Sequence, residues 1–246
     1  MKAIILAAGF GRRLQPITNT MPKSMVPVKD IPLIVRSMRK IKAMGVDRFV
    51  IVTGHMASYI KEKLSDNFEG TPISYIENSI YETTNNIYSL WMAAQHSDED
   101  VCLFECDLLY SELLLDDMIK SDADCAIVTS FFNKETMDGS VIEIKNEEEA
   151  INLVLKKEQG PDFDYTNYRK TVNIYKFKKD FWNEAFAPAL VKEVESGNVN
   201  SYYELVLKEI MHSNKWDMKV VNVPESYWCE IDDIDDLKRA EGSNLL

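Results

Sequence analysis

The sequence predicts an α/β protein with a mostly parallel central sheet. In the first half of the chain, short apolar runs alternate with segments of helical periodicity. Two of these runs end in small or charged residues that suit loops at the end of a strand. Because parallel strands need crossover connections, this alternation favours right-handed βαβ units. At 246 residues, the chain is long enough to form one large domain with a sizeable core.

The elements of the first half follow from these patterns in order. Residues 2–7 are an apolar run fit for a buried strand. Residues 33–44 have helical periodicity and stop before Gly45, a residue that commonly follows the end of a helix. The other expected strands are 49–53, 73–77 and 101–105, and the other expected helices are 58–66 and 87–95. Ligands of such sheets bind beyond the carboxyl ends of the strands, so the loops there are the candidate site.

The second half of the chain has a different pattern, with strand-like runs separated by polar turns. We expect residues 145–149 to form an exposed acidic turn. No internal repeat, low-complexity linker or clear boundary interrupts the chain, so residues 1–246 are expected to form one domain with a soft division near residue 124. The expected strands are 125–132, 140–144, 153–156, 171–177 and 219–223, and the expected helices are 181–196 and 201–212.

Charge and cysteine content narrow the class of protein. The formal net charge of −12 and the pI near 4.8 argue against a nucleic-acid-binding surface. No run approaches the roughly 20 apolar residues that a membrane span needs. The cysteines lack the spacing of a zinc site and no signal peptide is evident, so reduced thiols and a cytoplasmic location are expected. The cysteines are Cys102, Cys106, Cys125 and Cys229.

The segment from Leu6 to Lys23 carries the clearest chemical signal. A strand runs into small residues and two glycines, whose backbone can approach a ligand closely. Successive N–H groups in such a turn form a concavity that binds anions, and nearby cations would neutralise a polyphosphate. An ordinary glycine-rich βα loop remains the alternative. The residues expected to bind the polyphosphate are Leu6, Ala8, Gly9, Gly11, Arg12, Arg13 and Lys23.

Spacing separates this loop from two other phosphate-binding motifs. A dinucleotide fingerprint needs glycine where this chain has Leu14, and a helix where it has Pro16. A Walker loop is absent from the whole chain. The run from Leu6 to Pro16, followed by Pro22 and Lys23, instead resembles the signature of nucleotidyltransferases that join a nucleoside triphosphate to a phosphorylated small molecule. The chain departs from that signature at Arg12, where the family usually has Thr or Ser.

The resemblance implies a Rossmann-like three-layer α/β/α fold with a smaller β region for the acceptor. Residues 1–123 would bind mainly the nucleotide, and residues 124–246 would bind the acceptor and supply a second metal carboxylate. Lys23 and Arg13 would act on the triphosphate and stabilise charge at the α-phosphate. Lys156 or Lys157 would be the family's second lysine, which holds the acceptor phosphate.

Such a transfer needs charge neutralisation and no general base, because the acceptor oxygen is already anionic. Mg²⁺ favours one or two protein carboxylates, which should lie at strand ends. Asp107 closes an apolar strand, although it could also be a turn or capping residue. Glu230 and Asp232 point to the same side of an extended segment. The resemblance favours Asp107 and Asp232 as the Mg²⁺ ligands, and we expect Asp233, Asp235 and Asp236 to cap and begin the last helix.

Two further segments bear on the base and the acceptor. Thr84, Asn85 or Asn86 can cap the following helix, but the surplus of polar groups could also read a base or a ribose. The run from Asn85 to Leu90 resembles cytidylyltransferases of the phosphocholine and 2-aminoethylphosphonate type, which favours CTP. An acceptor of that type carries a cation that aromatic rings and carboxylates could hold. The candidate acceptor residues are Tyr202, Tyr203, Glu204, Trp228 and Glu230, with Tyr227 and, more weakly, Trp182.

The leading hypothesis is therefore a Mg²⁺-dependent cytidylyltransferase that transfers CMP from CTP to a phosphorylated or phosphonate amino-alcohol acceptor and releases pyrophosphate. A sugar-1-phosphate nucleotidyltransferase that uses UTP or dTTP is the alternative enzyme. A catalytically inactive nucleotide-sensing module is the alternative outside the enzymes. Expected partners are CTP and a small acceptor, with no nucleic acid and no membrane. The choice between phosphocholine and 2-aminoethylphosphonate stays open, as does the oligomeric state, a homodimer included.

Overall fold

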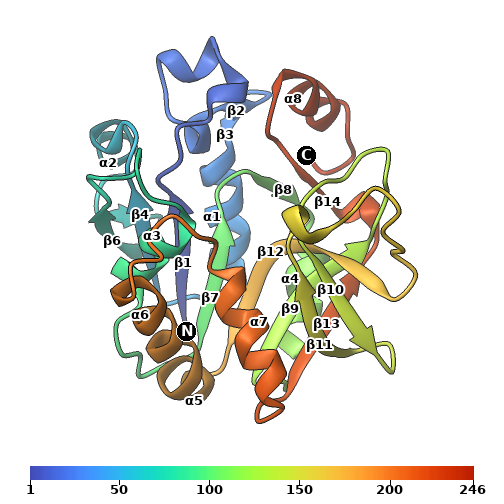
Figure 1. Ribbon diagram of the computed structural model, residues 1–246. Helices are drawn as coiled ribbons and strands as arrows, with labels where there is room; N and C mark the ends of the chain where they lie inside the picture. The colour runs from blue at the N-terminus through green and yellow to red at the C-terminus, as the bar shows by residue number, and fades with distance from the viewer.

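A computed structural model describes residues 1–246, and a ten-stranded sheet runs through the whole molecule (Figure 1). Its N-terminal part is parallel, as predicted, with β1 paired to β4 on one side and to β7 on the other. β6 extends this block beyond β4. These strands are β1 (Lys2–Ala7), β4 (Arg48–Thr53), β6 (Thr71–Glu77) and β7 (Val101–Glu105), and β5 (Asn67–Phe68) pairs antiparallel at the edge.

The sheet as a whole is mixed, so the expectation of a mostly parallel sheet holds only for the first half. β12 (Tyr168–Phe177) pairs antiparallel with β7 on one side and with β9 (Cys125–Phe131) on the other. β13 (Met218–Val223) then returns parallel to β9. β10 (Val141–Lys145) and β11 (Glu149–Val154) add an antiparallel extension to the sheet. A short turn rather than a helix connects β10 to β11.

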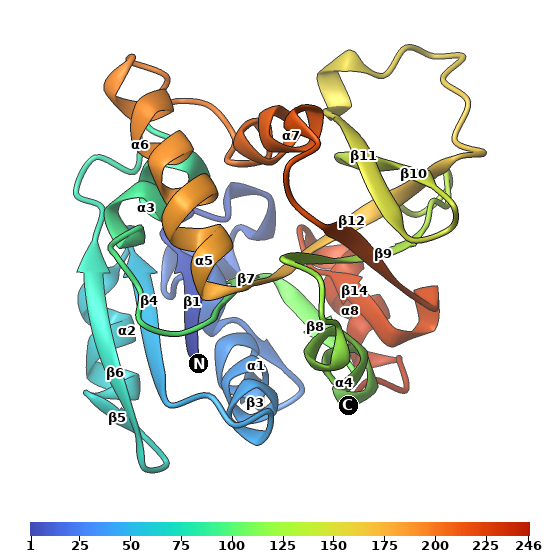
Figure 2. The ribbon, with the colours of Figure 1, turned by 90° about the horizontal axis from the view of Figure 1, so that it is seen from below.

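Helices cover both faces of the sheet, and each face has its own hydrophobic core (Figure 2). Alternate residues of β1 enter the two cores: Ile4 and Leu6 join one, and Ala3, Ile5 and Ala7 join the other. This explains why β1 is apolar from Ala3 to Ala7. One face carries α3 (Asn86–Ala93), α5 (Lys179–Phe181), α6 (Ala187–Glu195) and α7 (Glu204–Ser213), and the other carries α1 (Leu33–Ala43), α2 (Ala57–Leu64) and α4 (Glu112–Lys120).

The predicted elements are present, with corrections in the second half. The strand expected at 153–156 spans Glu149–Val154 instead, so Glu149 leaves the expected turn, which shortens to the residues between β10 and β11. The helix expected at 181–196 contains a π-helical segment at Trp182–Phe186 between α5 and α6. The helix expected at 201–212 begins at Glu204. The helix α4 and the short strands β8 and β14 were not predicted, because pairing and packing define them more than local pattern does.

A pair of short strands and the last helix lie at the upper end of the sheet in Figure 1. β8 (Leu108–Tyr110) pairs antiparallel with β14 (Trp228–Glu230), and α8 (Ile234–Glu241) follows at once. A third core joins α8 to the segment around Leu14 and to β2 (Pro27–Val28), which pairs with β3 (Ile31–Pro32). The C-terminal helix therefore packs directly on the glycine-rich segment.

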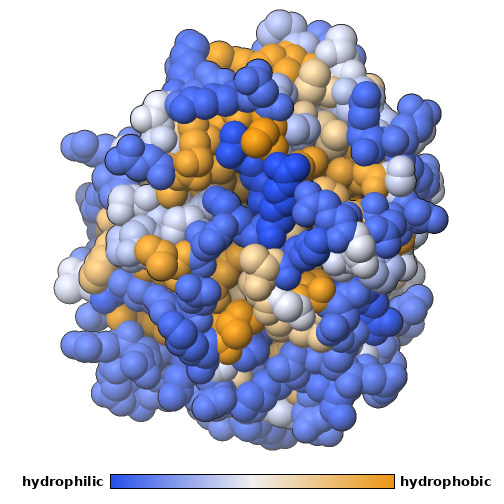
Figure 3. All heavy atoms as spheres, turned by 180° about the vertical axis from the view of Figure 1, so that it is seen from behind, coloured by the Kyte–Doolittle hydropathy of each residue, from blue (hydrophilic) through white to orange (hydrophobic).

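The surface is largely hydrophilic on the face opposite Figure 1, with apolar residues gathered in separate areas (Figure 3). None of the helices combines the length and the apolar character needed to cross a lipid bilayer.

Candidate active site

The glycine-rich loop leaves the carboxyl end of β1 and packs against the segment that carries Lys23. Gly11 adopts φ 68°, and a Cβ there would lie 2.8 Å from the Cβ of Lys23. Any other residue would therefore meet both backbone strain and a steric clash. Thr18 donates a hydrogen bond from Oγ1 to the Gly11 carbonyl over 2.9 Å. Glycine at this position thus lets the lysine stem pass directly beneath the loop.

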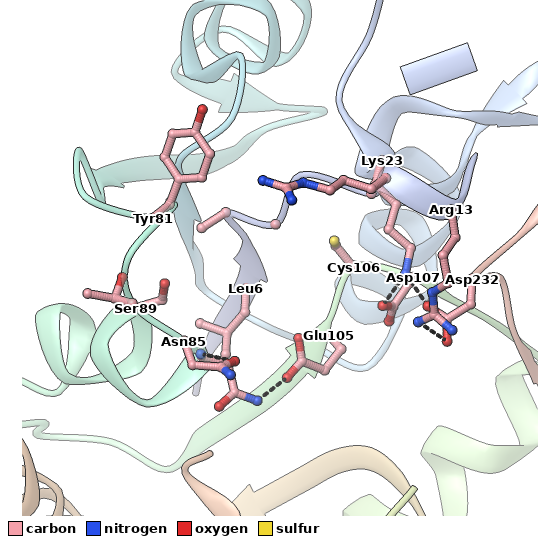
Figure 4. A pocket seen from close by; sticks show the side chains of 16 residues that line it. Leu6, Arg13, Lys23, Tyr81, Asn85, Ser89, Glu105, Cys106, Asp107 and Asp232 are labelled. Carbon is pink, nitrogen blue, oxygen red and sulfur yellow. Dashed lines mark hydrogen bonds and ion pairs between the residues drawn. The ribbon is translucent and has the colours of Figure 1, made fainter. Parts of the chain in front are cut away.

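Lys23 bridges the two carboxylates that the sequence singled out (Figure 4). Its Nζ lies 2.7 Å from Asp107 Oδ2 and 2.7 Å from Asp232 Oδ1. Arg13 adds a second cation, with Nη2 2.9 Å from Asp232 Oδ2. Burial by itself would lower the pKa of Lys23, but the charges of Asp107 and Asp232 outweigh it and raise that pKa well above its ordinary value. Lys23 is therefore a fully charged group at the centre of the site.

Pairing of the two short strands brings Asp232 to Asp107. Glu230 lies opposite Leu108 in the β14–β8 register, and the Ile231 N–H donates to the Asp107 carbonyl over 2.9 Å. Because β7 is parallel to β1 and beside it, Asp107 lies at the same sheet edge as the glycine-rich loop. Two carboxylates far apart in the sequence thus meet beside the glycine-rich loop.

The other acidic residues of this run have structural roles, as predicted. Asp233 accepts hydrogen bonds at Oδ1 from the N–H groups of Asp235 and Asp236, each over 2.9 Å. Asp236 accepts in return at Oδ2 from Asp232 and Asp233. This reciprocal pattern is a capping box that begins α8. Asp232 is left with its side chain turned to the site.

The carboxylates at this edge are suited to a divalent cation. One oxygen each of Asp107, Glu230 and Asp232 can be chosen so that all lie within 4.8 Å of one another. Asp107 Oδ1 is buried and has no hydrogen-bond donor. Hard oxygen ligands in small number are what Mg²⁺ requires, since it keeps waters and phosphate oxygens as its other ligands. The residues present therefore fit Mg²⁺.

A cavity of about 360 Å³ opens beside the glycine-rich loop. The Thr84–Asn86 segment forms its other wall, together with Tyr81 and Ser89. Every residue expected to contact the nucleotide borders this cavity: Leu6, Ala8, Gly9, Gly11, Arg12, Arg13, Lys23, Thr84, Asn85 and Asn86. The loop and the polar segment thus face each other across one space of a size suited to a nucleotide.

Several polar groups of the Thr84–Asn86 segment form hydrogen bonds within the protein. Asn85 accepts at Oδ1 from the Asn86 N–H and caps α3, which is the structural role considered for it. Asn86 accepts from the Tyr203 N–H over 3.1 Å and donates from Nδ2 to Glu105 over 3.4 Å. Thr84 donates to the Ile80 carbonyl. The surplus of polar groups noted in the sequence therefore serves in part to join α3 to β7 and α7.

At Arg12, where the chain departs from the family signature, the guanidinium group lies over the aromatic ring of Phe10. Its guanidinium carbon lies 5.2 Å from the centroid of the Phe10 ring, a cation–π geometry. Phe10 in turn stacks on His55 with ring centroids 4.0 Å apart. Arg12 thus contributes positive charge at the border of the cavity in place of a hydroxyl group.

A second cavity, of about 670 Å³, adjoins the first across Asp107 and Asp232. Glu105, Glu204 and Glu230 line it, and Tyr202 is its aromatic residue. Besides Lys23, three further lysines line the same space: Lys156, Lys157 and Lys170. Lys156 forms an exposed ion pair with Asp138. Asp107 and Asp232 line both cavities, so the two spaces meet at the paired carboxylates.

The aromatic cage expected around an acceptor cation is largely absent. Tyr203 is fully buried, because its ring packs edge-on against Tyr175, so placing it against an acceptor was wrong. Trp228 is 6% exposed and borders a neighbouring cavity instead. Trp182 is buried in the core and donates from Nε1 to the Gln95 carbonyl. Tyr202 and Glu204 do reach the second cavity.

The residues of this cavity that were not anticipated include Lys170 and Glu105. Lys170 is 2% exposed and donates from Nζ to the Thr171 carbonyl over 2.6 Å, with no carboxylate within ion-pair distance. Glu105 is the last residue of the otherwise apolar strand β7 and lies two residues before Asp107. The only sequence signal for these residues was a charge beside or within a strand-like run. Such a charge does not indicate which face of the sheet the side chain lies on or which cavity it lines.

Burial and mutual repulsion act on the glutamates. Burial first, and then the charges of Asp107 and Glu204, raise the pKa of Glu105 well above its ordinary value. Burial also raises the pKa of Glu230 to about 7, with Lys170 opposing this rise and Asp107 and Asp232 adding to it. Burial raises the pKa of Glu204 as well. The surroundings in this cavity therefore favour the protonated, uncharged forms of these three glutamates.

We expect Glu204→Gln to stabilise the unliganded protein in a pH-dependent manner. Because the pKa of Glu204 is raised on folding, the folded state retains a proton that the unfolded state releases. Wild-type stability therefore falls as pH rises above the ordinary glutamate value of 4.5, and the glutamine variant avoids this loss. Calorimetric unfolding from about pH 5 to about pH 8 should show a Tm advantage that grows with pH, at roughly 2–4 °C for each 1 kcal/mol recovered. Glu209→Gln, exposed on the same helix, is the control; an equal or pH-independent shift in both variants would contradict the assignment.

A phosphate-binding loop, a central lysine and a carboxylate pair at the edge of a mixed α/β sheet define an enzyme class that transfers phosphorus-containing groups. A sequence profile described as "Nucleotidyl transferase" matches residues 2–244, so the chain belongs to the nucleotidyl transferase family.

Relatives with assigned activities include two that align with nearly all of this chain. CMP-5'-(3-aminopropyl)phosphonate synthase of Streptomyces rubellomurinus is 27% identical over 241 residues, covering 98% of this chain and 38% of that protein. The chain thus spans well under half of that relative's length. CTP:phosphoglutamine cytidylyltransferase of Campylobacter jejuni is 26% identical over 258 residues, covering 97% of this chain and 98% of that protein.

The fold is shared with solved structures. The structure of CTP:phosphocholine cytidylyltransferase from Streptococcus pneumoniae matches with a TM-score of 0.75 at 21% identity, covering 98% of this chain and 97% of that one. At this identity the match establishes the mixed α/β nucleotidyltransferase fold.

Proposed function

We propose that this protein is a Mg²⁺-dependent cytidylyltransferase that transfers CMP from CTP to a phosphorylated or phosphonate amino-alcohol acceptor. The observation that carries the proposal is Lys23, held between Asp107 and Asp232 where the two cavities meet. One relative named for a CMP-phosphonate product and another named as a CTP-using cytidylyltransferase support the choice of base. The single domain divides, in this proposal, into residues 1–123 for the nucleotide and 124–246 for the acceptor.

The reaction is an in-line displacement at the α-phosphorus. An anionic oxygen of the acceptor forms a new bond to the α-phosphorus, and the bond from this phosphorus to the oxygen bridging to the β-phosphate breaks. Pyrophosphate leaves with that electron pair. The chain needs no general base for this step, so its contribution is positioning and charge stabilisation.

Each part of the site has a role in this reaction. Backbone N–H groups of the glycine-rich loop and the cations Arg12 and Arg13 would hold the triphosphate. Lys23 would stabilise negative charge at the α-phosphate, and Lys156 or Lys157 would hold the acceptor's anionic group. Asp107 and Asp232 would bind Mg²⁺, which supplies further charge neutralisation when it is bound. Glu230 lies beside them and would face the acceptor.

Pyrophosphate release measured with each of the four nucleoside triphosphates tests the proposal. Acceptors should include 2-aminoethylphosphonate, phosphocholine and glucose 1-phosphate, with and without Mg²⁺. We expect release with CTP and an amino-alcohol type of acceptor, and none after chelation of the metal. Release confined to UTP or dTTP with the sugar phosphate would replace the proposal with the sugar-nucleotide alternative. No release with any pair would indicate a nucleotide-sensing module.

A further inference from the structure

The second cavity contains three glutamates that no cation of the protein neutralises by a direct ion pair. Of the basic residues that line this cavity, Lys23 and Arg13 pair with Asp107 and Asp232, and Lys156 pairs with Asp138. Lys157 and Lys170 line it without forming an ion pair. No lysine, arginine or histidine lies within ion-pair distance of Glu105, Glu204 or Glu230. The three carboxyl groups thus face the cavity without a direct ion pair from the protein.

Glu204 shows most directly that a donor is missing. It is 6% exposed, lines the cavity, and has a buried Oε2 that accepts no hydrogen bond. Glu105 accepts a long hydrogen bond of 3.4 Å from Asn86. Buried carboxylates without donors are costly, so their persistence beside a ligand cavity indicates that the ligand supplies the donors.

The composition of the wall separates two kinds of cationic ligand. A primary ammonium has three N–H donors, and each can reach a carboxylate oxygen. A quaternary ammonium has none, and proteins bind it with several aromatic faces. Here Tyr202 is the only aromatic side chain that lines the cavity, because Tyr203 and Trp228 pack elsewhere. The cavity therefore matches the first kind of ligand and lacks the features needed for the second.

We propose that Glu204, together with Glu105 and Glu230, binds a primary ammonium group of the acceptor and selects against quaternary ammonium acceptors. This inference rests on the proposed function, since it assigns one end of the acceptor that receives the CMP group. The anionic end of the same acceptor then lies toward Asp107, Asp232 and the lysines of the cavity. The preferred substrate class is a small zwitterion with a phosphate or phosphonate at one end and a primary amine at the other.

Three acceptors that differ at the cationic end test the proposal: 2-aminoethylphosphonate, ethylphosphonate, which lacks the amine, and phosphocholine. With CTP and Mg²⁺, we expect kcat/KM for 2-aminoethylphosphonate to exceed the value for each of the others by roughly tenfold to a hundredfold. In Glu204→Gln, the ratio between 2-aminoethylphosphonate and ethylphosphonate should fall toward one. Glu209→Gln, an exposed change on the same helix, should keep the wild-type ratio.

Calorimetric titration of 2-aminoethylphosphonate and ethylphosphonate into the same three proteins separates this inference from the proposed function. Suppose that no nucleotide yields pyrophosphate but 2-aminoethylphosphonate still binds more tightly to wild type than to Glu204→Gln. The proposed transfer reaction would then be wrong, and the proposed ammonium site would be supported. Equal use of phosphocholine and 2-aminoethylphosphonate by the wild type would overturn the inference. An unchanged preference in Glu204→Gln would overturn it as well, even if that variant gains thermal stability.

Discussion

Replacing Lys23 with alanine is expected to lower kcat by roughly 10²–10³-fold, the usual effect of removing one preorganised group that stabilises transition-state charge. The Lys23 ammonium lies 2.7 Å from both Asp107 and Asp232, and no other lysine contacts either carboxylate. The loss should appear in kcat more than in KM, because charge builds on the phosphate oxygens as the reaction proceeds. Steady-state pyrophosphate release with CTP at saturating Mg²⁺ measures it.

Lys120→Ala is a suitable control for this variant, since its side chain is 75% exposed and distant from the site elements. Thermal unfolding with and without Mg²⁺ shows whether the Lys23 variant remains folded. Removing the lysine leaves two neighbouring carboxylates without their shared counter-charge, so added Mg²⁺ should stabilise the variant more than the wild type. Wild-type turnover in a folded Lys23→Ala protein would remove this residue from the mechanism.

Asp107→Asn should reduce turnover by roughly a hundredfold or more, since a metal bound at phosphate oxygens contributes several kcal/mol. The change keeps the size of the side chain and removes the charge that Lys23 and a metal would share. The Mg²⁺ concentration needed for half-maximal activity should also rise, which a metal titration of the residual activity would show.

Asp98→Asn provides the matched comparison, because Asp98 has a 96% exposed side chain. It should leave both the rate and the metal requirement near wild type. An Asp107→Asn protein with the normal Mg²⁺ requirement would mean that Asp107 is a turn residue, the structural alternative that its position after β7 leaves open.

Local patterns predicted the elements of the first half well because each of those elements carries its own signal. Strand β1 is apolar on both faces because both faces are buried, and α1 ends where Gly45 follows. The second half was predicted less well. Antiparallel strands such as β12 are placed by pairing with partners distant in the sequence, and the π-helical turn at Trp182–Phe186 lies within a run that reads as ordinary helix. The short strands β8 and β14 have too few residues to show periodicity.

The sequence by itself singled out the glycine-rich loop, the lysine and the two acidic residues, because each depends on residue types within a short stretch. It also determined the capping role of Asp233 and Asp236, since a capping box is a local pattern. Only the tertiary structure decided which residues line the second cavity. Burial removed Tyr203 and Trp228 from the expected cage, while pairing of β14 with β8 and the start of α7 placed Glu230 and Glu204 beside Glu105. A side chain's orientation and burial depend on what packs around it, and that information lies in contacts between residues far apart along the chain.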